Sequence, residues 1–181
     1  MNPGDSNTQV GFIGLGIMGG SMAGHILAAG YPLNVTNRSR EKADGLVAKG
    51  AKWHATPGEV AAASDVVVTM LGYPQDVEQV YLGEDGLVAR AVPGAILIDM
   101  TTSSPALAQR IAEQAAGKGV QAIDAPVSGG DVGARDAKLA IMVGGEPSAF
   151  EAAFPILQKM GANIVLQGGP GAGQHTKMCN Q

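Results

Sequence analysis

The sequence is poor in the residues that build several kinds of site. It has a single cysteine, Cys179, so no disulfide can form within the chain, and a reducing, cytoplasmic location is expected. Its three histidines, His25, His54 and His175, lack the spacing of metal ligands, so no metal site is expected. A net charge of −4 gives no attractive field for nucleic acid or an anionic membrane. No apolar run is long enough to span a bilayer, and residues 1–8 are predicted to be a flexible tail, not a signal peptide.

The chain does contain a regular alternation of short Val/Ile-rich runs and alanine-rich stretches with helical periodicity. Hydrophobic residues make up 45% of the 181 residues and charged residues 15%, which suffices for a substantial core. Apolar runs typical of strands buried on both faces are residues 10–13, 33–36, 65–71, 95–100, 120–123, 139–143 and 163–166. This alternation predicts an α/β fold with a doubly wound, mostly parallel sheet.

Several helix boundaries have recognisable signals. Thr56-Pro57-Gly58-Glu59 is typical of a capping box with proline at the first helical position. Ser104, followed by proline, predicts a second helix start of the same kind. The segment 147–160 contains Pro155, so a kink or two short helices are expected there.

The clearest motif is a strand that runs into Gly-x-Gly-x-x-Gly. Gly14 permits a tight turn, Gly16 lets the backbone approach a pyrophosphate, and Gly19 lets the following helix pack closely on the strand. The motif predicts dinucleotide binding at the helix N-terminus, and the alternative is a purely structural glycine-rich turn. The predicted contacts in this loop are Gly14, Leu15, Gly16, Ile17, Met18 and Gly19.

The end of the second predicted strand bears on which dinucleotide is bound. NAD-binding domains place an acid about 20 residues after the glycines, but this chain has Asn37 and Arg38 there, followed by Ser39. An arginine at this place can pair with the 2′-phosphate of NADP. We therefore predict that Asn37, Arg38 and Ser39 bind the cofactor, with NADP preferred and NAD as the alternative. The other interpretation of Arg38 is an ordinary solvated arginine at a helix start.

Three further segments resemble the β-hydroxyacid dehydrogenase family. They are Asp-Met-Thr-Thr-Ser-Ser-Pro at 99–105, Asp-Ala-Pro-Val-Ser-Gly-Gly at 124–130, and the Gly-Ala-Gly-Gln-His-Thr-Lys-Met-Cys-Asn-Gln segment at 171–181. With the glycine loop, four motifs occur in the family's order. The family includes 3-hydroxyisobutyrate dehydrogenase, tartronate semialdehyde reductase and, more distantly, 6-phosphogluconate dehydrogenase. The resemblance implies a Rossmann-type NADP-binding domain over 9–168 and the truncated start of an interdomain helix over 169–181. It also implies that the family's all-helical second domain is missing from this chain.

The resemblance implies roles for residues at the nicotinamide end of the cofactor. Leu71, Gly72 and Thr102 are expected to border the nicotinamide. Many family members carry proline at the position of Gly72. The alternative for Thr102 is a helix-start residue, since threonine favours such places.

The resemblance also implies a substrate site and a catalytic residue. Ser128, Gly129 and Gly130 are expected to hold a substrate carboxylate, although such a sequence is by itself most often a plain turn. Lys177 is expected to be the catalytic proton donor or acceptor, because a protonated lysine supplies both a proton and positive charge to a developing alkoxide. Asn180 and Gln181 are expected to orient the substrate hydroxyl, since both lie about one helical turn after the lysine.

These inferences predict an NADP-dependent oxidoreductase that interconverts a small β-hydroxyacid and its semialdehyde. The full-length protein is expected to be a homo-oligomer, and this chain alone is expected to have little or no activity. One alternative is an imine-reducing relative, which shares the fold but replaces the lysine. The other is a non-catalytic NADP-binding module that serves interaction or sensing.

Overall fold

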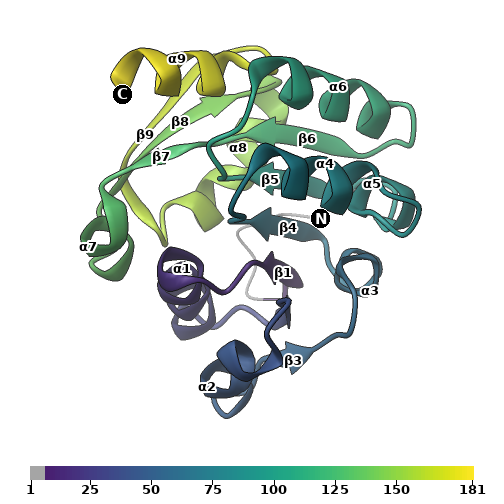
Figure 1. Ribbon diagram of the computed structural model, residues 1–181, viewed down its shortest axis with the longest axis vertical. Helices are drawn as coiled ribbons and strands as arrows, with labels where there is room; N and C mark the ends of the chain where they lie inside the picture. Colours follow the sequence, from purple (N-terminus) through teal and green to yellow (C-terminus); the bar gives the residue numbers. More distant parts are fainter. Residues whose placement is uncertain (1–6) are drawn as a thin grey trace.

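The computed structural model describes residues 7–181, which form a nine-stranded sheet covered by helices on both faces (Figure 1). The strands are β1 (Val10–Ile13), β2 (Leu33–Thr36), β3 (Lys52–Trp53), β4 (Val66–Thr69), β5 (Ile96–Asp99), β6 (Gln121–Asp124), β7 (Val127–Ser128), β8 (Leu139–Gly144) and β9 (Gly161–Gly168). Their order is β3-β2-β1-β4-β5-β6-β8-β7, and β9 pairs with β8. Among the strands of the described residues, only the pairings of β8 with β6 and β7 are antiparallel. The predicted Rossmann-type, mostly parallel α/β fold is confirmed.

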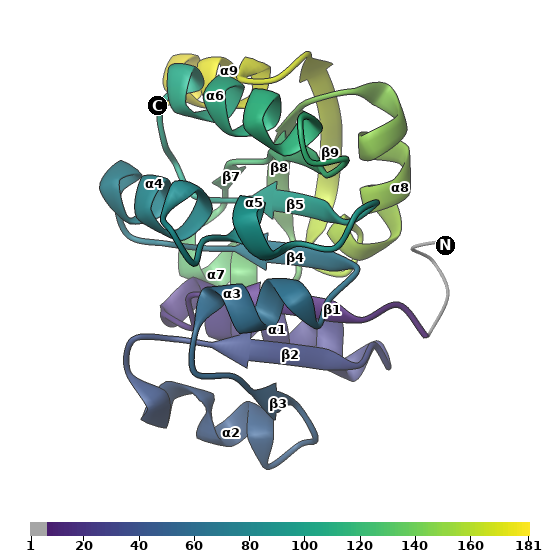
Figure 2. The same cartoon turned by 90° about the vertical axis from the view of Figure 1, so that its right-hand side faces the viewer.

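The helices form two layers, one on each face of the sheet (Figure 2). One layer contains α1 (Ile17–Ala28), the 3-10 helix η1 (Arg40–Ala43), α2 (Asp44–Val47), α7 (Gly130–Arg135) and α8 (Pro147–Leu157). The other contains α3 (Pro57–Ala62), α4 (Pro74–Leu82), α5 (Leu87–Arg90) and α6 (Pro105–Ala116). A last helix, α9 (Ala172–Asn180), lies beside α6, β8 and β9.

The central strands are continuous apolar runs because both of their faces are buried. In β4, Val66 and Val68 contribute to the core under α1 and α8, whereas Val67 contributes to the core under α3 to α6. Successive side chains of a strand point to opposite faces, so a strand covered on both sides needs apolar residues at every position. All seven predicted runs contain strands. The two strands that were not predicted, β3 and β7, have two residues each, too few to show a periodicity.

The predicted helix caps are present. The Thr56 hydroxyl accepts a hydrogen bond from the Glu59 N–H at 3.2 Å, and the Glu59 carboxylate accepts one from the Ala55 N–H at 2.8 Å. The Ser104 hydroxyl accepts one from the Leu107 N–H at 3.1 Å, which starts α6. These side chains satisfy N–H groups that have no partner inside the helix.

The expectation of two short helices within 147–160 is wrong, because α8 is one continuous helix over Pro147–Leu157 that includes Pro155. Pro155 lies near the C-terminal end, so the helix continues for only two residues beyond it. Its neighbours Ala153 and Ile156 are fully buried against the sheet. Packing of this face therefore holds the last turn in place despite the missing N–H of proline.

The ends of the chain are described in part. Residues 1–6 of the expected flexible tail lie outside the described residues, and Thr8 is already buried. Within residues 7–181, none of the helices has the length and apolar character needed to cross a bilayer.

Candidate functional site

The loop between β1 and α1 has the geometry that its glycines predict. Gly14 has a φ of +94°, and a Cβ there would collide with the carbonyl oxygen of Met70. A Cβ at Gly19 would collide with the Gly14 carbonyl oxygen, so this glycine lets α1 approach the loop. A Cβ at Gly16, in contrast, would have nothing within 4 Å. Gly14 and Gly19 are therefore required by packing, whereas Gly16 leaves open space above the backbone.

Asn37 holds this glycine loop in place. Its Oδ1 accepts a hydrogen bond from the Leu15 N–H at 2.9 Å, and its Nδ2 donates to the Ser39 carbonyl oxygen at 2.9 Å. The Leu15 side chain is buried in the core. Both residues were predicted to bind the cofactor, but in the structure the Asn37 amide braces the backbone and the Leu15 side chain packs under the loop.

A cavity of about 830 Å³ opens at the carboxyl ends of β1, β2 and β4. The predicted cofactor residues that line it are Gly14, Gly16, Ile17, Met18, Gly19, Asn37, Arg38, Ser39, Leu71 and Gly72. Leu15 and Thr102 are not among its lining residues. In open α/β sheets, ligands bind outside the carboxyl ends of the strands, at the place where α1 also presents the unpaired N–H groups of its first turn. The cavity therefore fits an extended dinucleotide.

The cavity also has charged lining residues that the sequence analysis did not identify, notably Lys42 and Asp76. Asp76 lies in the first turn of α4, and its Oδ1 is 3.7 Å from Nη1 of Arg38. The Arg38 side chain is 88% exposed and that of Asp76 is 27% exposed. The other carboxylate oxygen, Oδ2, is buried and has no hydrogen-bond partner among residues 7–181.

A second group of site residues forms around α9, whose N-terminus is bound by a buried acid. The two carboxylate oxygens of Asp124 accept hydrogen bonds from the Gly171 N–H at 2.7 Å and the Gln174 N–H at 2.8 Å. A carboxylate at a helix N-terminus is also stabilised by the helix dipole. Burial raises the pKa of Asp124 above its ordinary value, and the backbone N–H groups only partly oppose this effect.

Gln174 connects α9 to the loop after β5. It is fully buried, its Nε2 donates to the Thr101 carbonyl oxygen at 2.8 Å, and its Oε1 accepts from the Ser103 N–H at 2.8 Å. The Thr101 hydroxyl in turn accepts from the Leu71 N–H at 2.9 Å, at the edge of the cavity. Thr102, the predicted nicotinamide neighbour, is an exposed residue of this same loop. The loop thus joins the cavity to the helix that carries Lys177.

Lys177 is buried, with 7% exposure, and lies three residues after Gln174 on the same face of α9. Its ammonium has no hydrogen bond or ion pair with any residue of the described chain. One turn further on, Asn180 donates from Nδ2 to the Ser128 hydroxyl at 3.3 Å. Gln181 follows the helix and is exposed. The structure therefore brings the predicted catalytic helix against the predicted substrate loop.

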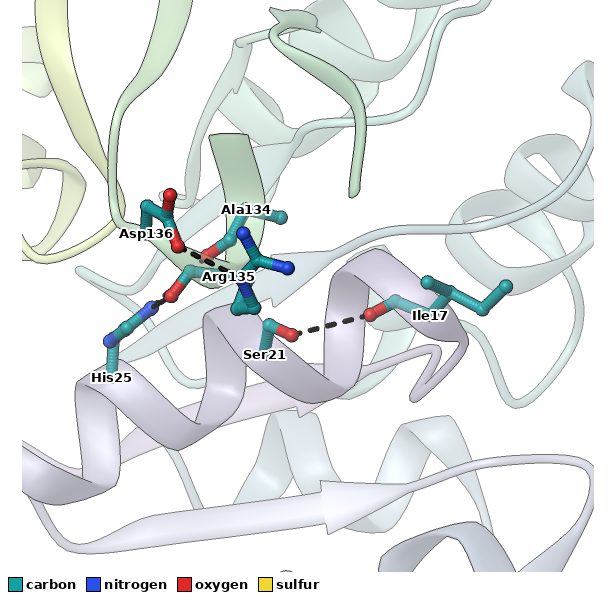
Figure 3. Close-up of polar contacts among 6 residues, drawn as sticks. All are labelled: Ile17, Ser21, His25, Ala134, Arg135 and Asp136. Atoms are coloured by element: carbon teal, nitrogen blue, oxygen red, sulfur yellow. Dashed lines mark hydrogen bonds and ion pairs between the residues drawn. The ribbon is translucent and has the colours of Figure 1, made fainter. Parts of the chain in front are cut away.

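That substrate loop is a sharp turn between β7 and α7. Gly129 and Gly130 have φ values of +131° and +61°, which favour glycine, and both residues are exposed. The far end of α7 is attached to α1, the helix that follows the glycine loop (Figure 3). Nε2 of His25 lies 3.0 Å from the Ala134 carbonyl oxygen and 2.9 Å from that of Arg135. Because carbonyl oxygens only accept, Nε2 carries the hydrogen.

A buried acid, Asp99, lies at the end of β5 next to Asp124 on β6. Its Oδ1 accepts hydrogen bonds from the Thr69 hydroxyl at 2.9 Å and the Thr101 N–H at 3.0 Å. Burial raises the pKa of Asp99 to about 6, against the lowering effect of these bonds. Asp99 and Asp124 belong to the segments that resemble the family, but the sequence alone assigned them no role. The detectable signal was their place at the carboxyl ends of adjacent strands.

The described residues contain no group of three His, Cys, Asp or Glu side chains that could hold a metal ion.

Relatives of this chain are oxidoreductases. It is 58% identical over 172 residues to the uncharacterised oxidoreductase YkwC of Bacillus subtilis, covering 95% of the chain and 60% of that protein. It is 44% identical to the 3-hydroxyisobutyrate dehydrogenase of Pseudomonas aeruginosa, with 96% and 58% covered. The 2-hydroxy-3-oxopropionate reductase of Escherichia coli is 42% identical, with 96% and 59% covered. The chain thus spans about three fifths of the length of these relatives.

A solved structure shares the fold closely. The 3-hydroxyisobutyrate dehydrogenase of Mycobacterium tuberculosis, determined with L-serine, superposes with a TM-score of 0.90 at 37% identity, covering 96% of this chain and 59% of that one. Residues 9–169 match the family described as the NAD binding domain of 6-phosphogluconate dehydrogenase. The glycine loop, the cavity beside it and these matches lead to one conclusion: the chain belongs to the 6-phosphogluconate dehydrogenase NAD-binding domain family, together with the β-hydroxyacid dehydrogenases that its sequence resembles.

Proposed function

We propose that this chain is the cofactor-binding part, over residues 9–168, of an NADP-dependent oxidoreductase that interconverts a small β-hydroxyacid and its semialdehyde. The observation that carries this proposal is the hydrogen bond between Asn180 and Ser128. It joins the helix of buried Lys177 to a glycine turn suited to a carboxylate. A proton-transfer group and an anion site thereby lie together, at the end of the network that begins at Leu71 in the cavity.

The residues of the cavity fit the cofactor. The open space above Gly16 admits a pyrophosphate, and the first-turn N–H groups of α1 face it. Arg38, exposed at the end of β2, supplies a cation for the 2′-phosphate of NADP. Leu71, Gly72 and Thr102 are assigned to the nicotinamide end, since Leu71 lines the cavity and is linked to Gln174 of α9 through Thr101. The bound nicotinamide supplies or accepts the hydride.

Lys177 exchanges the proton in this proposal. For reduction, its ammonium donates a proton to the carbonyl oxygen and stabilises the developing negative charge. For oxidation, the neutral amine accepts the proton of the hydroxyl. Because the ammonium has no partner among residues 7–181, it is available to a substrate oxygen. Burial keeps water away from this group and strengthens its interaction with the substrate.

The substrate class follows from the loop that α9 contacts through Asn180. The Ser128 hydroxyl and the exposed N–H groups of Gly129 and Gly130 hold a carboxylate without a competing negative charge. Asn180 or Gln181 orients the hydroxyl. A short acid fits, and the relatives named for 3-hydroxyisobutyrate and 2-hydroxy-3-oxopropionate act on substrates of this kind.

The wider context of the proposal is a full-length, cytoplasmic homo-oligomer in which residues 169–181 begin the helix that leads to a second domain. The two other candidate functions, imine reduction and non-catalytic cofactor binding, are disfavoured by the buried Lys177, which neither requires.

The proposal is tested in two steps. Titration of this chain with NADPH and NADH measures cofactor binding directly. A full-length protein is then assayed with NADPH against a panel of short semialdehydes with and without a carboxylate. We expect binding by the chain and turnover only of the carboxylate-bearing compounds. Equal turnover of compounds that lack the carboxylate, or a preference for cyclic imines, would contradict the proposed substrate class.

A further inference from the structure

The acid that NAD-binding domains place at the end of the second strand is missing from β2, but the fold supplies one from another element. Asp76, in the first turn of α4, lines the dinucleotide cavity beside Arg38, with Oδ1 3.7 Å from the guanidinium nitrogen. This distance is longer than a hydrogen bond. The tertiary structure therefore places a carboxylate next to the cation that we assign to the 2′-phosphate.

The Asp76 carboxylate has unused hydrogen-bonding capacity. Neither oxygen has a hydrogen-bond donor among residues 7–181, and Oδ2 is buried. Gly72 provides the room for this arrangement, since a Cβ at that position would lie 3.3 Å from Oδ2. A partly buried carboxylate without donors is unfavourable. Because Oδ2 is buried while the side chain is 27% exposed, a ligand that donates a hydrogen bond would meet this carboxylate at Oδ1, beside Arg38.

The other acids of the cavity do not share this property. Both oxygens of Asp85 have partners, because Oδ2 accepts from the Thr56 hydroxyl at 3.1 Å and Oδ1 lies 3.3 Å from Nε of Arg90. Glu84 is exposed, so water satisfies it. Asp76 is therefore the acid of the described cavity that is best placed to bind a ligand.

We propose that Asp76 is a second determinant of cofactor specificity, which accepts a hydrogen bond from an adenosine ribose hydroxyl of NADH and repels the 2′-phosphate of NADPH. This inference rests on the proposed dinucleotide site. NADH presents free hydroxyl donors beside Arg38, which a carboxylate can accept. NADPH presents a phosphate instead, which offers acceptors and negative charge. Arg38 thus favours NADPH and Asp76 favours NADH. The chain binds both cofactors, and the two residues together set the ratio of their affinities.

The test compares the binding of NADH and NADPH, measured by calorimetric titration without any substrate. Asp76→Asn keeps the shape of the side chain and removes its charge. We expect NADH to bind about tenfold more weakly to this variant, the effect of losing a charge-assisted hydrogen bond, and NADPH to bind several-fold more tightly. Asp76→Glu, which keeps the charge, should retain more of the NADH affinity than Asp76→Asn does.

Glu78→Gln is the matched control. Glu78 lies on the same helix and forms an ion pair with Arg110, but it does not line the cavity. Its substitution removes the same charge from α4 and should leave the NADH to NADPH affinity ratio unchanged. Thermal melting of all three variants shows whether α4 remains folded.

The outcomes separate this inference from the proposed function. A folded Asp76→Asn variant whose affinity ratio stays within twofold of the wild-type ratio overturns the role of Asp76 alone. A ratio that shifts equally in Glu78→Gln also overturns it, since the effect would then be a general one of charge. A wild-type chain that binds neither dinucleotide overturns the proposed function, and the role of Asp76 with it.

Discussion

The side chain of Asn180 donates a hydrogen bond to the hydroxyl of Ser128, at a distance of 3.3 Å and across 52 positions of sequence. The resemblance to the family implied a substrate role for each residue separately, Ser128 in the segment 124–130 and Asn180 in the segment 171–181. Their contact holds the last turn of α9 against the turn between β7 and α7. A substrate carboxylate at Ser128 would consequently lie within reach of the helix that carries Lys177.

Substrate anchoring can be tested by Ser128→Ala in a full-length protein. The substitution removes a hydroxyl that binds the carboxylate and holds Asn180, so kcat/KM for carboxylate substrates should fall by about 10- to 100-fold. The affinity for NADPH, measured by titration, should stay unchanged because Ser128 does not line the dinucleotide cavity. Loss of NADPH binding with normal substrate kinetics would show that the loop has been assigned to the wrong ligand.

Lys177→Ala in a full-length protein should lower kcat by about 10²- to 10⁴-fold, the usual contribution of a positioned general acid. Lys177→Arg should restore little, because arginine keeps the charge but does not release its proton. Cofactor affinity should be nearly constant in both variants. Near-normal turnover by Lys177→Ala would refute the catalytic role and favour the non-catalytic binding module.

The glycine loop offers a matched pair of substitutions. Gly16→Ala adds a methyl group in open space, so the free energy of unfolding should change by about 1 kcal/mol or less, while the methyl group blocks the approach of a pyrophosphate. Gly19→Ala places the methyl group against the Gly14 carbonyl oxygen. This variant should therefore lower the free energy of unfolding by about 1 to 3 kcal/mol, unlike Gly16→Ala. Denaturant unfolding and NADPH titration measure the two effects. If Gly16→Ala binds NADPH normally, the pyrophosphate does not lie there.

Arg38→Ala tests the origin of the NADP preference. Loss of a charge-assisted contact with the 2′-phosphate should weaken NADPH binding by about 1 to 3 kcal/mol, or about 5- to 150-fold in Kd. NADH lacks this phosphate, so its affinity should change little. Parallel titrations of both cofactors decide the matter, and equal losses for both would argue against a phosphate contact.

Asp99 makes stability depend on pH. Its pKa is raised by burial from the ordinary value of 3.8 to about 6, so the folded state binds this proton more tightly than the unfolded state does. The contribution of the protonated Asp99 to the free energy of unfolding is complete below about pH 3.8 and is lost as the pH rises to about 6. A pKa difference of roughly two units corresponds to a loss of about 3 kcal/mol.

Asp99→Asn cannot ionise, and its amide oxygen can still accept from Thr69 and Thr101. The difference in unfolding free energy between this variant and the wild type should therefore grow in favour of the variant between pH 4 and pH 6. Urea unfolding across this range measures the difference. A constant difference from pH 4 to pH 7 would show that Asp99 does not titrate in this way.

The fold class could be predicted from the sequence alone. A strand that is buried on both faces must be apolar at every position, so it appears in the sequence as a continuous apolar run. The sequence also determined the glycine loop, since a tight turn and a close helix approach exclude a Cβ at Gly14 and Gly19. The strands β3 and β7 could not be predicted from the sequence, because two residues are too few to show a periodicity. The continuity of α8 through Pro155 was decided by burial of its face, which outweighs the local preference of proline.

Which polar groups meet depends on how distant elements pack together. Asp76 is in sequence an ordinary acid in the first turn of a helix, and its contact with Arg38 depends on how α4 packs beside the end of β2. Likewise, Asp124 binds the N-terminus of α9, and the other end of this helix contacts the loop of Ser128 through Asn180. Sequence patterns reflect the local requirements of helices, strands and turns. The partners of a buried charge instead come from elements far apart in sequence, which the sheet brings to the same edge.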